Sequence, residues 1–573
     1  MEYLLFILAM AVFVLVIFVS ESARARKEEK RFVQSLYEDY GKLADKEYSL
    51  ERFAKMDSFF LRHQKDGQLD DITWNDLGMD ELFKRMNYTL SASGEEYLYY
   101  TLRTLKQEEE ELLHLEDVIR FFGEHPDERV KVQLAVRSLG YTGKYSLYDY
   151  LDNLDYLGQR SNRKHILADL LFLPLTGLLW INFSVAIIGI VILIIYNIIS
   201  YFQEKGEIDP YITSFSYVMR LLQTCGNLEK IPIPVCGQEW EKIGRAAGRM
   251  QAMKRNSYWV MSPYRGNASG DILAVFLDYV RMVFHVDLIK FNGMLKVLRG
   301  HMEDVDAMIE VVGYVETAIA IWGFRESMEA GTGKEEEGKK TGNGWCVPEF
   351  IREGSLTVEQ GYHPLLDAPV KNGILAKRGI LLTGSNASGK STFLKTMAIN
   401  AILAQTIHTC AADRYRAPFF HVYSSMALRD DMGSGESYYI VEIKALKRIL
   451  DAASGKRGPV LCFVDEVLRG TNTVERIAAS TQILKSLSRS GILCFAATHD
   501  IELTELLQGY FDNYHFEEDV REGDVFFNYK LQPGKASTRN AIKLLELMGY
   551  DAEVIEKATA QAERFVNSGV WKG

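Results

Sequence analysis

Two tracts of this chain consist almost entirely of apolar residues, and they stand out from the amphipathic pattern around them. The first covers residues 3–19, and the second, residues 170–202, contains no charged side chain. A helix of about 20 apolar residues is long enough to cross a bilayer, with about 17 as the lower limit. The hydropathy pattern therefore predicts membrane segments at both places.

The residues that flank the first tract give it an orientation. Met1 and Glu2 precede it, whereas five lysines and arginines follow between residues 24 and 31. A cleaved signal peptide has basic residues before the apolar run and small residues after it. Because basic flanks remain in the cytoplasm, residues 1–20 are predicted to form a transmembrane anchor with its N-terminus outside. A buried core helix is the alternative.

The second tract is too long for one membrane span. As a single helix it would reach about 50 Å, whereas the hydrocarbon core is about 30 Å thick. Pro174 and Asn182 offer places for the helix to break. We therefore expect a transmembrane hairpin at 166–202, with spans of roughly 166–181 and 183–202. A helical hairpin that is buried in protein or lies at the membrane interface is the alternative.

The remaining chain divides into helical and mixed regions. Residues 21–165 and 203–325 have few helix breakers, which predicts an all-α core and lever domain in two parts. Residues 326–345 include a charged, glycine-rich segment and are predicted to be a flexible linker. From 346 to 573, short apolar runs alternate with helical patterns, as in an α/β domain with a parallel sheet.

The composition narrows the possible partners. The formal net charge is −11, so the chain lacks an overall basic field, and any DNA-binding surface has to be local. The six cysteines include no C-x-x-C pair. This spacing argues against a zinc site or a disulfide framework and is typical of a reducing cytosol.

A phosphate-binding motif opens the mixed region. An apolar run, Ile380 to Leu382, precedes a glycine-rich loop, and a helical pattern follows from Phe393. This order is typical of the phosphate loop of nucleotide triphosphatases (a P-loop), in which backbone N–H groups and a helix N-terminus surround phosphate oxygens. A glycine-rich turn without a ligand is the alternative. The residues expected to contact ATP or GTP are Gly384, Ser385, Asn386, Ala387, Ser388, Gly389, Lys390, Ser391 and Thr392.

Three polar residues that follow apolar strands complete the predicted site. Asp465 and Glu466 end one such strand, and His499 follows the next. In nucleotide triphosphatases an acidic residue at a strand end holds Mg²⁺, and a second group orients or deprotonates the attacking water. We therefore expect Glu466 to act on water and His499 to sense the γ-phosphate. A structural histidine is the alternative.

The same pattern predicts which residues bind the metal ion and which residue contacts the phosphates. Ser391 and Asp465 are the predicted Mg²⁺ ligands, and Lys390 is expected to contact the β- and γ-phosphates as part of the catalytic set. Nothing in the sequence indicates a site for a second substrate. Water is therefore the expected acceptor, and a conformational change the expected result of hydrolysis.

These motifs resemble the ATPase domain of the MutS family of DNA mismatch-repair proteins. The resemblance covers residues 345–560 well and residues 75–330, which are similar to the family's core and lever helices, weakly. The ATPase segments that carry it are Gly384–Thr392, Asp465–Thr473, Ala497–Thr504, a signature-like segment at Asp431–Glu442 and a turn at Gly361–Pro364.

The resemblance implies ATP as the nucleotide, Mg²⁺ as its metal, an ABC-type fold for the ATPase domain, and a homodimer. In the family, a signature serine reaches the γ-phosphate bound to the other subunit, and Ser437 is the matching residue here. We therefore expect Ser437 to act in trans. The family also suggests a helical clamp that opens and closes on mismatched or branched DNA with the nucleotide state.

The chain departs from the family pattern in its first part. The predicted membrane anchor stands where the family has its mismatch-reading module, so we expect that N-terminal domain to be missing. The second apolar tract falls where the lever helices of the family lead to a DNA-clasping region. In the signature segment, Tyr438-Tyr439 replaces the usual Thr-Phe. Nucleotide chemistry therefore carries over from the family, whereas mismatch recognition does not.

Two hypotheses follow from these observations. The first is a membrane-anchored, MutS-like ATPase, DNA-dependent by resemblance, whose hydrolysis of ATP switches a dimeric helical clamp on DNA. The second is an ATP-driven membrane scaffold or remodelling protein that does not bind DNA, and the net acidity and the hairpin favour it. In both, lipid is a partner and the chain is a multi-pass protein of the cell membrane. The ATPase domain is expected in the cytoplasm, because two crossings at 166–202 return the chain to the side that holds ATP.

Overall fold

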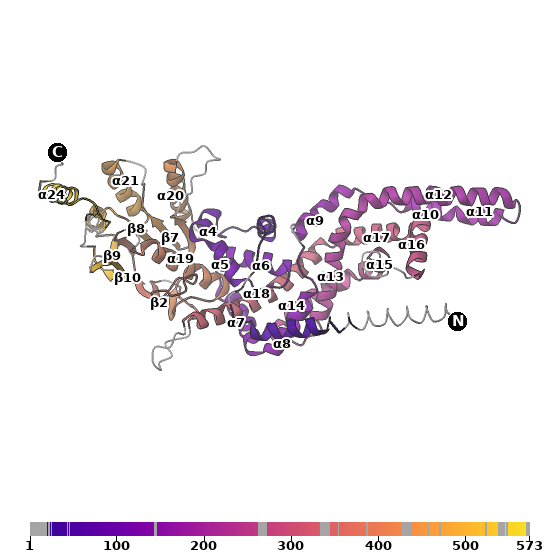
Figure 1. Ribbon diagram of the computed structural model, residues 1–573, viewed down its shortest axis with the longest axis horizontal. Helices are drawn as coiled ribbons and strands as arrows, with labels where there is room; N and C mark the ends of the chain where they lie inside the picture. Colours follow the sequence, from indigo (N-terminus) through magenta and orange to yellow (C-terminus); the bar gives the residue numbers. More distant parts are fainter. Residues whose placement is uncertain are drawn as a thin grey trace.

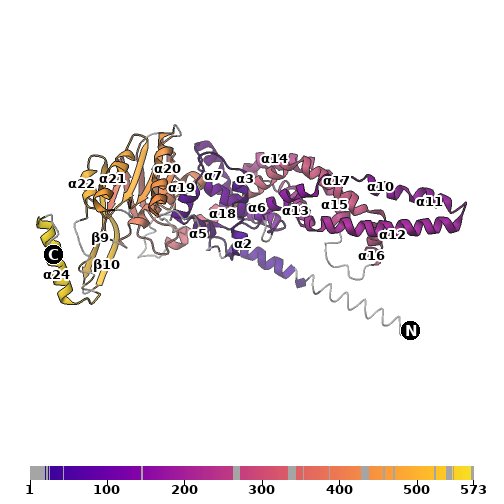
Figure 2. The same cartoon turned by 90° about the horizontal axis from the view of Figure 1, so that it is seen from above.

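The computed structural model is elongated, with β-sheets at one end and a helical hairpin at the other (Figure 1). A bundle of helices joins the two ends, as the view from above also shows (Figure 2). The predicted anchor lies almost entirely outside the described part of the chain. The structure describes residues 20, 23–24, 26–42, 44, 46–142, 146–261, 272–332, 344–352, 354–385, 388–426, 438–455, 458–468, 472–521, 524–536, 542, 545 and 548–568.

The predicted all-α region is a bundle of short and medium helices. Its helices are α2 (Leu50–Phe53), α3 (Ser58–Arg62), α4 (Asp71–Leu77), α5 (Met79–Met86), α6 (Ala92–Arg103), α7 (Glu109–Glu124), α8 (Pro126–Arg137), α9 (Leu147–Asn153), α13 (Ile212–Leu228), α14 (Gly237–Arg249), α15 (Gln251–Met261), α16 (Ile272–Phe284), α17 (Val286–Gly300) and α18 (Met302–Thr332). Short 3₁₀ segments occur at Leu154–Leu157, Asp209–Tyr211 and Pro234–Cys236.

Polar residues at the helix ends define several of these elements. The Asp70 side chain accepts a hydrogen bond from the Thr73 backbone N–H (2.8 Å) at the start of α4. Gly78 ends this helix with a φ of 67°, a left-handed conformation that glycine adopts easily. The Ser91 hydroxyl caps α6 by accepting from the Gly94 N–H. Such caps satisfy backbone groups that a helix leaves without partners.

The long helix α18 is the centre of the bundle and packs against α6, α7, α13 and α14. It is apolar enough to span a membrane, but 78% of its most apolar stretch is buried inside the protein, so it is a core helix. The helix continues into the segment predicted as a linker and ends at Thr332, where Met328 is still buried in the core. Residues 333–343 of that linker lie outside the described residues.

The second apolar tract forms a protruding helical hairpin (Figure 1). Its arms are α10 (Arg163–Leu170) with α11 (Phe172–Leu178), and α12 (Phe183–Ile208). Asn182 caps α12 by accepting from the Val185 N–H (3.2 Å), so the chain reverses at one of the residues where a break is predicted. The most apolar stretch of α12 has a mean hydropathy of 2.6 and is only 17% buried. Insertion into a membrane stays a prediction.

The C-terminal region contains two sheets flanked by helices (Figure 2). The smaller sheet has the order β1-β5-β2-β3, and the larger has the order β10-β9-β4-β8-β7-β6. The strands are β1 (Glu349–Phe350), β2 (Leu356–Gly361), β3 (Asn372–Ala376), β4 (Gly379–Thr383), β5 (Arg414–Ala417), β6 (His421–Ser425), β7 (Val460–Asp465), β8 (Ile492–Ala497), β9 (Phe511–Arg521) and β10 (Asp524–Pro533). The helices are α19 (Lys390–Ile407), α20 (Tyr438–Ser454), α21 (Thr473–Ser486), α22 (Glu502–Leu506) and α24 (Ala552–Ser568).

The prediction of a parallel sheet is only partly right, because both sheets are mixed. Strands β9, β4, β8, β7 and β6 are parallel neighbours, but β10 pairs with β9 in the antiparallel sense. Only two residues separate β9 from β10, and so short a connection permits only a hairpin. The central strands β4 and β7 are buried at every position, as expected for parallel strands covered on both faces.

A buried ion cluster joins the helical bundle to the sheet region. Arg325 on α18 donates to both carboxylate oxygens of Glu116 on α7 (2.9 and 2.6 Å) and to the backbone carbonyl of His408, which ends α19 (3.0 Å). Burial alone would raise the pKa of Glu116, but hydrogen bonds from His408 and Arg325 outweigh it and hold the pKa at about 2. The charged cluster therefore links α19 directly to the central helix of the bundle.

Candidate functional site

The glycine-rich loop connects β4 to α19 at the carboxyl ends of the parallel strands of the larger sheet. Gly384 has a φ of 145°, and a Cβ atom there would lie 2.9 Å from the Phe516 carbonyl oxygen and from the Ser388 hydroxyl. Only glycine fits this conformation and this space. Helix α19 begins at Lys390, so its N-terminus, with its partial positive charge, borders the loop.

Lys390 lies across the loop that precedes it. Its ammonium group donates to the backbone carbonyls of Gly384 (2.8 Å) and Ser385 (2.7 Å). The Ser385 hydroxyl in turn donates to the carboxylate of Glu518 on β9. The loop is thus held by its own lysine on one side and by a strand more than 120 residues away on the other.

The two predicted metal ligands are in direct contact. The Ser391 hydroxyl, in the first turn of α19, donates to Asp465 Oδ2 at the end of β7 over 2.5 Å. Both are oxygen donors, which Mg²⁺ prefers. Among the described residues, no group of three or more His, Cys, Asp or Glu side chains is arranged to hold a metal. The pair therefore fits Mg²⁺, which commonly takes one or two protein ligands and completes its shell with water and phosphate oxygens.

Glu466 and His499 also meet. His499 Nε2 lies 2.8 Å from Glu466 Oε1, and β7 and β8, which carry these residues at their ends, are adjacent parallel strands. Glu466 has a φ of 58°, a left-handed conformation that is uncommon for residues other than glycine. Such backbone strain occurs preferentially at functional sites.

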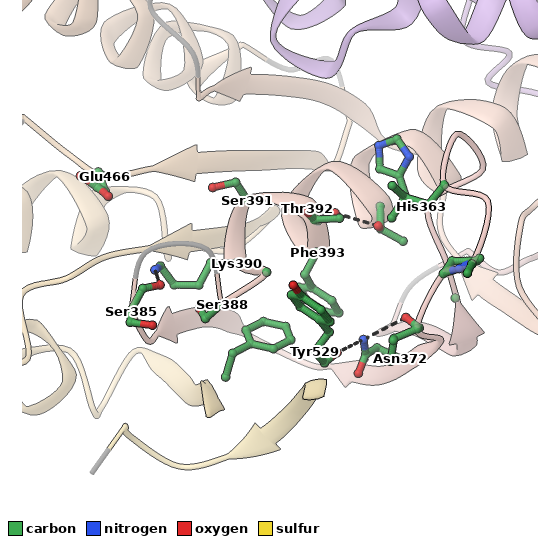
Figure 3. A pocket seen from close by; sticks show the side chains of 18 of the residues that line it. His363, Asn372, Ser385, Ser388, Lys390, Ser391, Thr392, Phe393, Glu466 and Tyr529 are labelled. Atoms are coloured by element: carbon green, nitrogen blue, oxygen red, sulfur yellow. Dashed lines mark hydrogen bonds between the residues drawn. The ribbon is translucent and has the colours of Figure 1, made fainter. Parts of the chain in front are cut away.

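Most of the predicted site residues line one cavity of about 670 Å³, whereas Gly384 and Asp465 lie behind its wall. Figure 3 shows Ser385, Ser388 and Lys390 at one side of it, with Tyr529 and Phe393 nearby. Ser391, Thr392, Glu466 and His499 contribute to the lining, so most of the predicted site is brought together. Asn386, Ala387 and Ser437 lie outside the described residues.

The cavity has walls that the sequence analysis did not assign. Tyr529 on β10 adopts a φ of 52°, within an irregularity of the β9–β10 pairing, and its ring lies beside Gly389. The Asn372 side chain donates to the Tyr529 carbonyl over 2.9 Å. An aromatic residue in a β-hairpin has no local motif, so no signal in the sequence singles out Tyr529.

His363, in the turn before β3, is a second unassigned wall residue. Burial, with smaller effects from Lys395 and Arg85, lowers its pKa to about 4, so the ring is neutral near pH 7. Its Nδ1 accepts a hydrogen bond from the Leu365 N–H (3.3 Å), which agrees with a neutral ring. The turn resembles a family motif, which was the only signal available for this residue.

Comparison with known proteins covers the region that contains these motifs. Residues 380–566 match the family model described as MutS domain V. The resemblance to the MutS family is therefore confirmed for this C-terminal part of the chain. All the predicted site residues, from Gly384 to His499, lie inside the matched range.

Several relatives, each named DNA mismatch repair protein MutS, align with this MutS domain. The protein of Thermus thermophilus is 32% identical over 223 residues, which are 38% of this chain and 27% of the relative. The protein of Lactobacillus delbrueckii subsp. bulgaricus is 30% identical over 238 residues, 39% of this chain and 28% of the relative. The matched region therefore spans only about a quarter of these relatives' length.

Proposed function

We propose that this MutS-type domain binds and hydrolyses ATP with Mg²⁺, and that the nucleotide state switches a dimeric helical clamp in a membrane-anchored protein. The proposal rests on how the predicted site residues are arranged around one cavity. Lys390, Ser391 and the Glu466–His499 pair line the same cavity, Asp465 contacts it through Ser391, and its volume is typical of a small-molecule site.

Each part of the site has a role in nucleotide binding. The N-terminus of α19 and the Lys390 ammonium stabilise the negative phosphates. On binding them, Lys390 replaces its hydrogen bonds to the loop carbonyls with contacts to phosphate oxygens. The Tyr529 ring offers a face for the base. Ser391 and Asp465 hold Mg²⁺, which, when bound, neutralises charge that develops on the phosphates.

Hydrolysis requires a group that accepts a proton. Glu466 is proposed to take the proton of the attacking water. The water oxygen bonds to the γ-phosphorus, and the bond between the γ-phosphorus and the ADP oxygen breaks. His499 orients the Glu466 carboxylate through their 2.8 Å contact and lies where it can respond to loss of the γ-phosphate. Ser437 of a second copy is proposed to complete the site.

The route from this site to the bundle runs through α19. This helix begins at Lys390 and ends at His408, whose carbonyl oxygen accepts from Arg325 on α18. A shift of α19 on nucleotide binding therefore reaches the central helix through a buried contact. We propose that the moving bundle grips mismatched or branched DNA; the relatives that align with the MutS domain are named DNA mismatch repair proteins.

A second function is supported by the exposed hairpin. Its apolar side chains include Leu173, Trp180, Phe183 and Ile192, each more than 60% exposed, and the chain is acidic overall. These features favour a membrane scaffold that is switched by ATP and does not bind DNA.

ATP turnover by the full chain in lipid nanodiscs tests both functions. Homoduplex, mismatched and branched DNA are added at two salt concentrations, because DNA affinities depend strongly on salt. Stimulation by one DNA form supports the clamp. Turnover that ignores DNA, with no DNA binding at low salt, supports the scaffold. Turnover that persists in Lys390→Ala would contradict the proposed site.

A further inference from the structure

A cavity of about 720 Å³ lies at the foot of the hairpin, between the start of α10 and the last turns of α12. The helices that flank it, α10 and α12, lie far from the sheet region that holds the proposed nucleotide site (Figure 2). Its lining combines charged groups with exposed apolar side chains, and those used below are Arg160, Arg163, Lys164, Tyr196, Ile199 and Glu207.

The charges in this cavity do not balance. Arg160, Arg163 and Lys164 face only two carboxylates, Glu204 and Glu207, which leaves one net positive charge. The Arg160 side chain is only 13% exposed. It lies 3.6 Å from Glu204 and also pairs with Glu207. The neighbouring His165 adds no charge near pH 7, because burial lowers its pKa to about 4.

Two of the cations remain available to a ligand. Lys164 contacts Glu204, but its side chain is 63% exposed. Arg163 is exposed and, within the described part of the chain, forms no ion pair. The cavity therefore offers two accessible cations, Lys164 in contact with Glu204 and Arg163 with the net positive charge, beside the buried Arg160.

Apolar side chains continue directly from the cavity along α12. Tyr196 and Ile199 line it and are 59% and 55% exposed, and Ile192 continues the same surface one turn further. From Phe183 to Phe202 the helix has a length of about 30 Å, which matches the hydrocarbon core of a bilayer. In a membrane-inserted hairpin the cations would therefore lie at the level of the lipid headgroups.

We propose that this cavity binds the phosphate of an acidic phospholipid between Arg163 and Lys164, with the acyl chains along Tyr196 and Ile199. The inference rests on the proposed insertion of the hairpin. Charge complementarity selects an anionic headgroup, and the continuous apolar surface selects a lipid over a free phosphate.

The test uses the full chain, purified in detergent, with phosphatidylglycerol or phosphatidylcholine added and bound lipid counted by native mass spectrometry. The double variant R163Q/K164Q is compared with K131Q/K557Q, which removes two exposed cations elsewhere. We expect the first variant to lose about 30-fold in affinity for phosphatidylglycerol, from about 1 kcal/mol per cation, and the control to lose nothing.

Three results would overturn the inference. These are equal retention of phosphatidylglycerol by both variants, equal binding of phosphatidylcholine by the unmodified chain, and complete displacement of the lipid by inorganic phosphate at equal concentration. Membrane insertion is measured separately, by carbonate extraction of membranes that contain the chain. Release of the chain by carbonate contradicts the proposed insertion, while the detergent experiment still decides whether the headgroup site exists.

Discussion

Tyr529 combines an unusual backbone with a prominent position at the nucleotide cavity. Its φ of 52° costs free energy for a residue with a bulky side chain, and its carbonyl is held by Asn372. The ring lies beside Gly389 of the phosphate loop. At the residue scale, this arrangement indicates that the ring serves the ligand rather than the core.

We expect Tyr529→Ala to weaken ATP binding by about 10- to 100-fold, since stacking of a base on an aromatic ring contributes about 1–3 kcal/mol. The turnover number should change little, because the ring is remote from Glu466. Titration with a fluorescent ATP analogue measures the dissociation constant. Tyr529→Phe is the matched control and should bind like the unmodified chain; equal binding by the alanine variant would exclude the stacking role.

Elements in the helical bundle carry buried acids whose protonation affects stability. Glu96 on α6 is buried near Ser146, the cap of α9, and burial raises its pKa to about 8 from an ordinary 4.5. The folded state therefore binds a proton that the unfolded state has already released. The contribution of Glu96 to the free energy of unfolding is therefore fully present below about pH 4.5 and decreases as the pH rises towards 8. Glu316 on α18, with a pKa of about 7, acts in the same sense.

We expect Glu96→Gln to reduce the loss of stability between pH 7 and 8, where Glu316, with its lower pKa, contributes less. One proton accounts for at most about 1.4 kcal/mol per pH unit. Thermal unfolding midpoints across this range measure the effect. Glu110→Gln, on the exposed face of α7, should keep the original slope, and an unchanged slope in Glu96→Gln would contradict the pKa of about 8.

The elements show what a sequence can and cannot predict here. Gly384, Ser385, Ser388 to Thr392, Asp465, Glu466 and His499 follow strands within local motifs, so their meeting at the carboxyl ends of the parallel strands could be predicted. From the β9–β10 hairpin, more than 120 residues from the loop, Tyr529 lines the same cavity and Glu518 contacts the loop through Ser385. No periodicity or spacing encodes such a contact. The antiparallel β10 was missed for a related reason, since an added hairpin looks like further alternating apolar runs.

At the scale of the whole molecule, the nucleotide cavity and the exposed hairpin occupy opposite ends (Figure 1). The bundle between them is joined to the sheet region through Arg325 and Glu116. This arrangement would suit transmission of a nucleotide-dependent change toward the hairpin, for which we propose insertion into a membrane. Trp180, at the tip of the hairpin and 92% exposed, marks the part that would emerge on the far side.

We expect Trp180→Cys to react with a membrane-impermeant maleimide added outside intact cells, because two spans place the tip outside. Asp209→Cys, at the foot, should react only after the membrane is opened. Five of the six native cysteines are buried, so the background is low. Labelling of Trp180→Cys only in opened cells would indicate a hairpin that does not cross.

Single-turnover hydrolysis by Glu466→Gln shows whether this carboxylate accepts the proton of the attacking water. The variant keeps the size of the side chain but cannot accept a proton, and it is compared with Glu303→Gln on the exposed start of α18. We expect the rate of hydrolysis to fall about 10²- to 10⁴-fold while the dissociation constant for ATP stays within about twofold. Hydrolysis at the unmodified rate in Glu466→Gln would show that the reaction does not depend on this carboxylate, and the proposed site would be wrong.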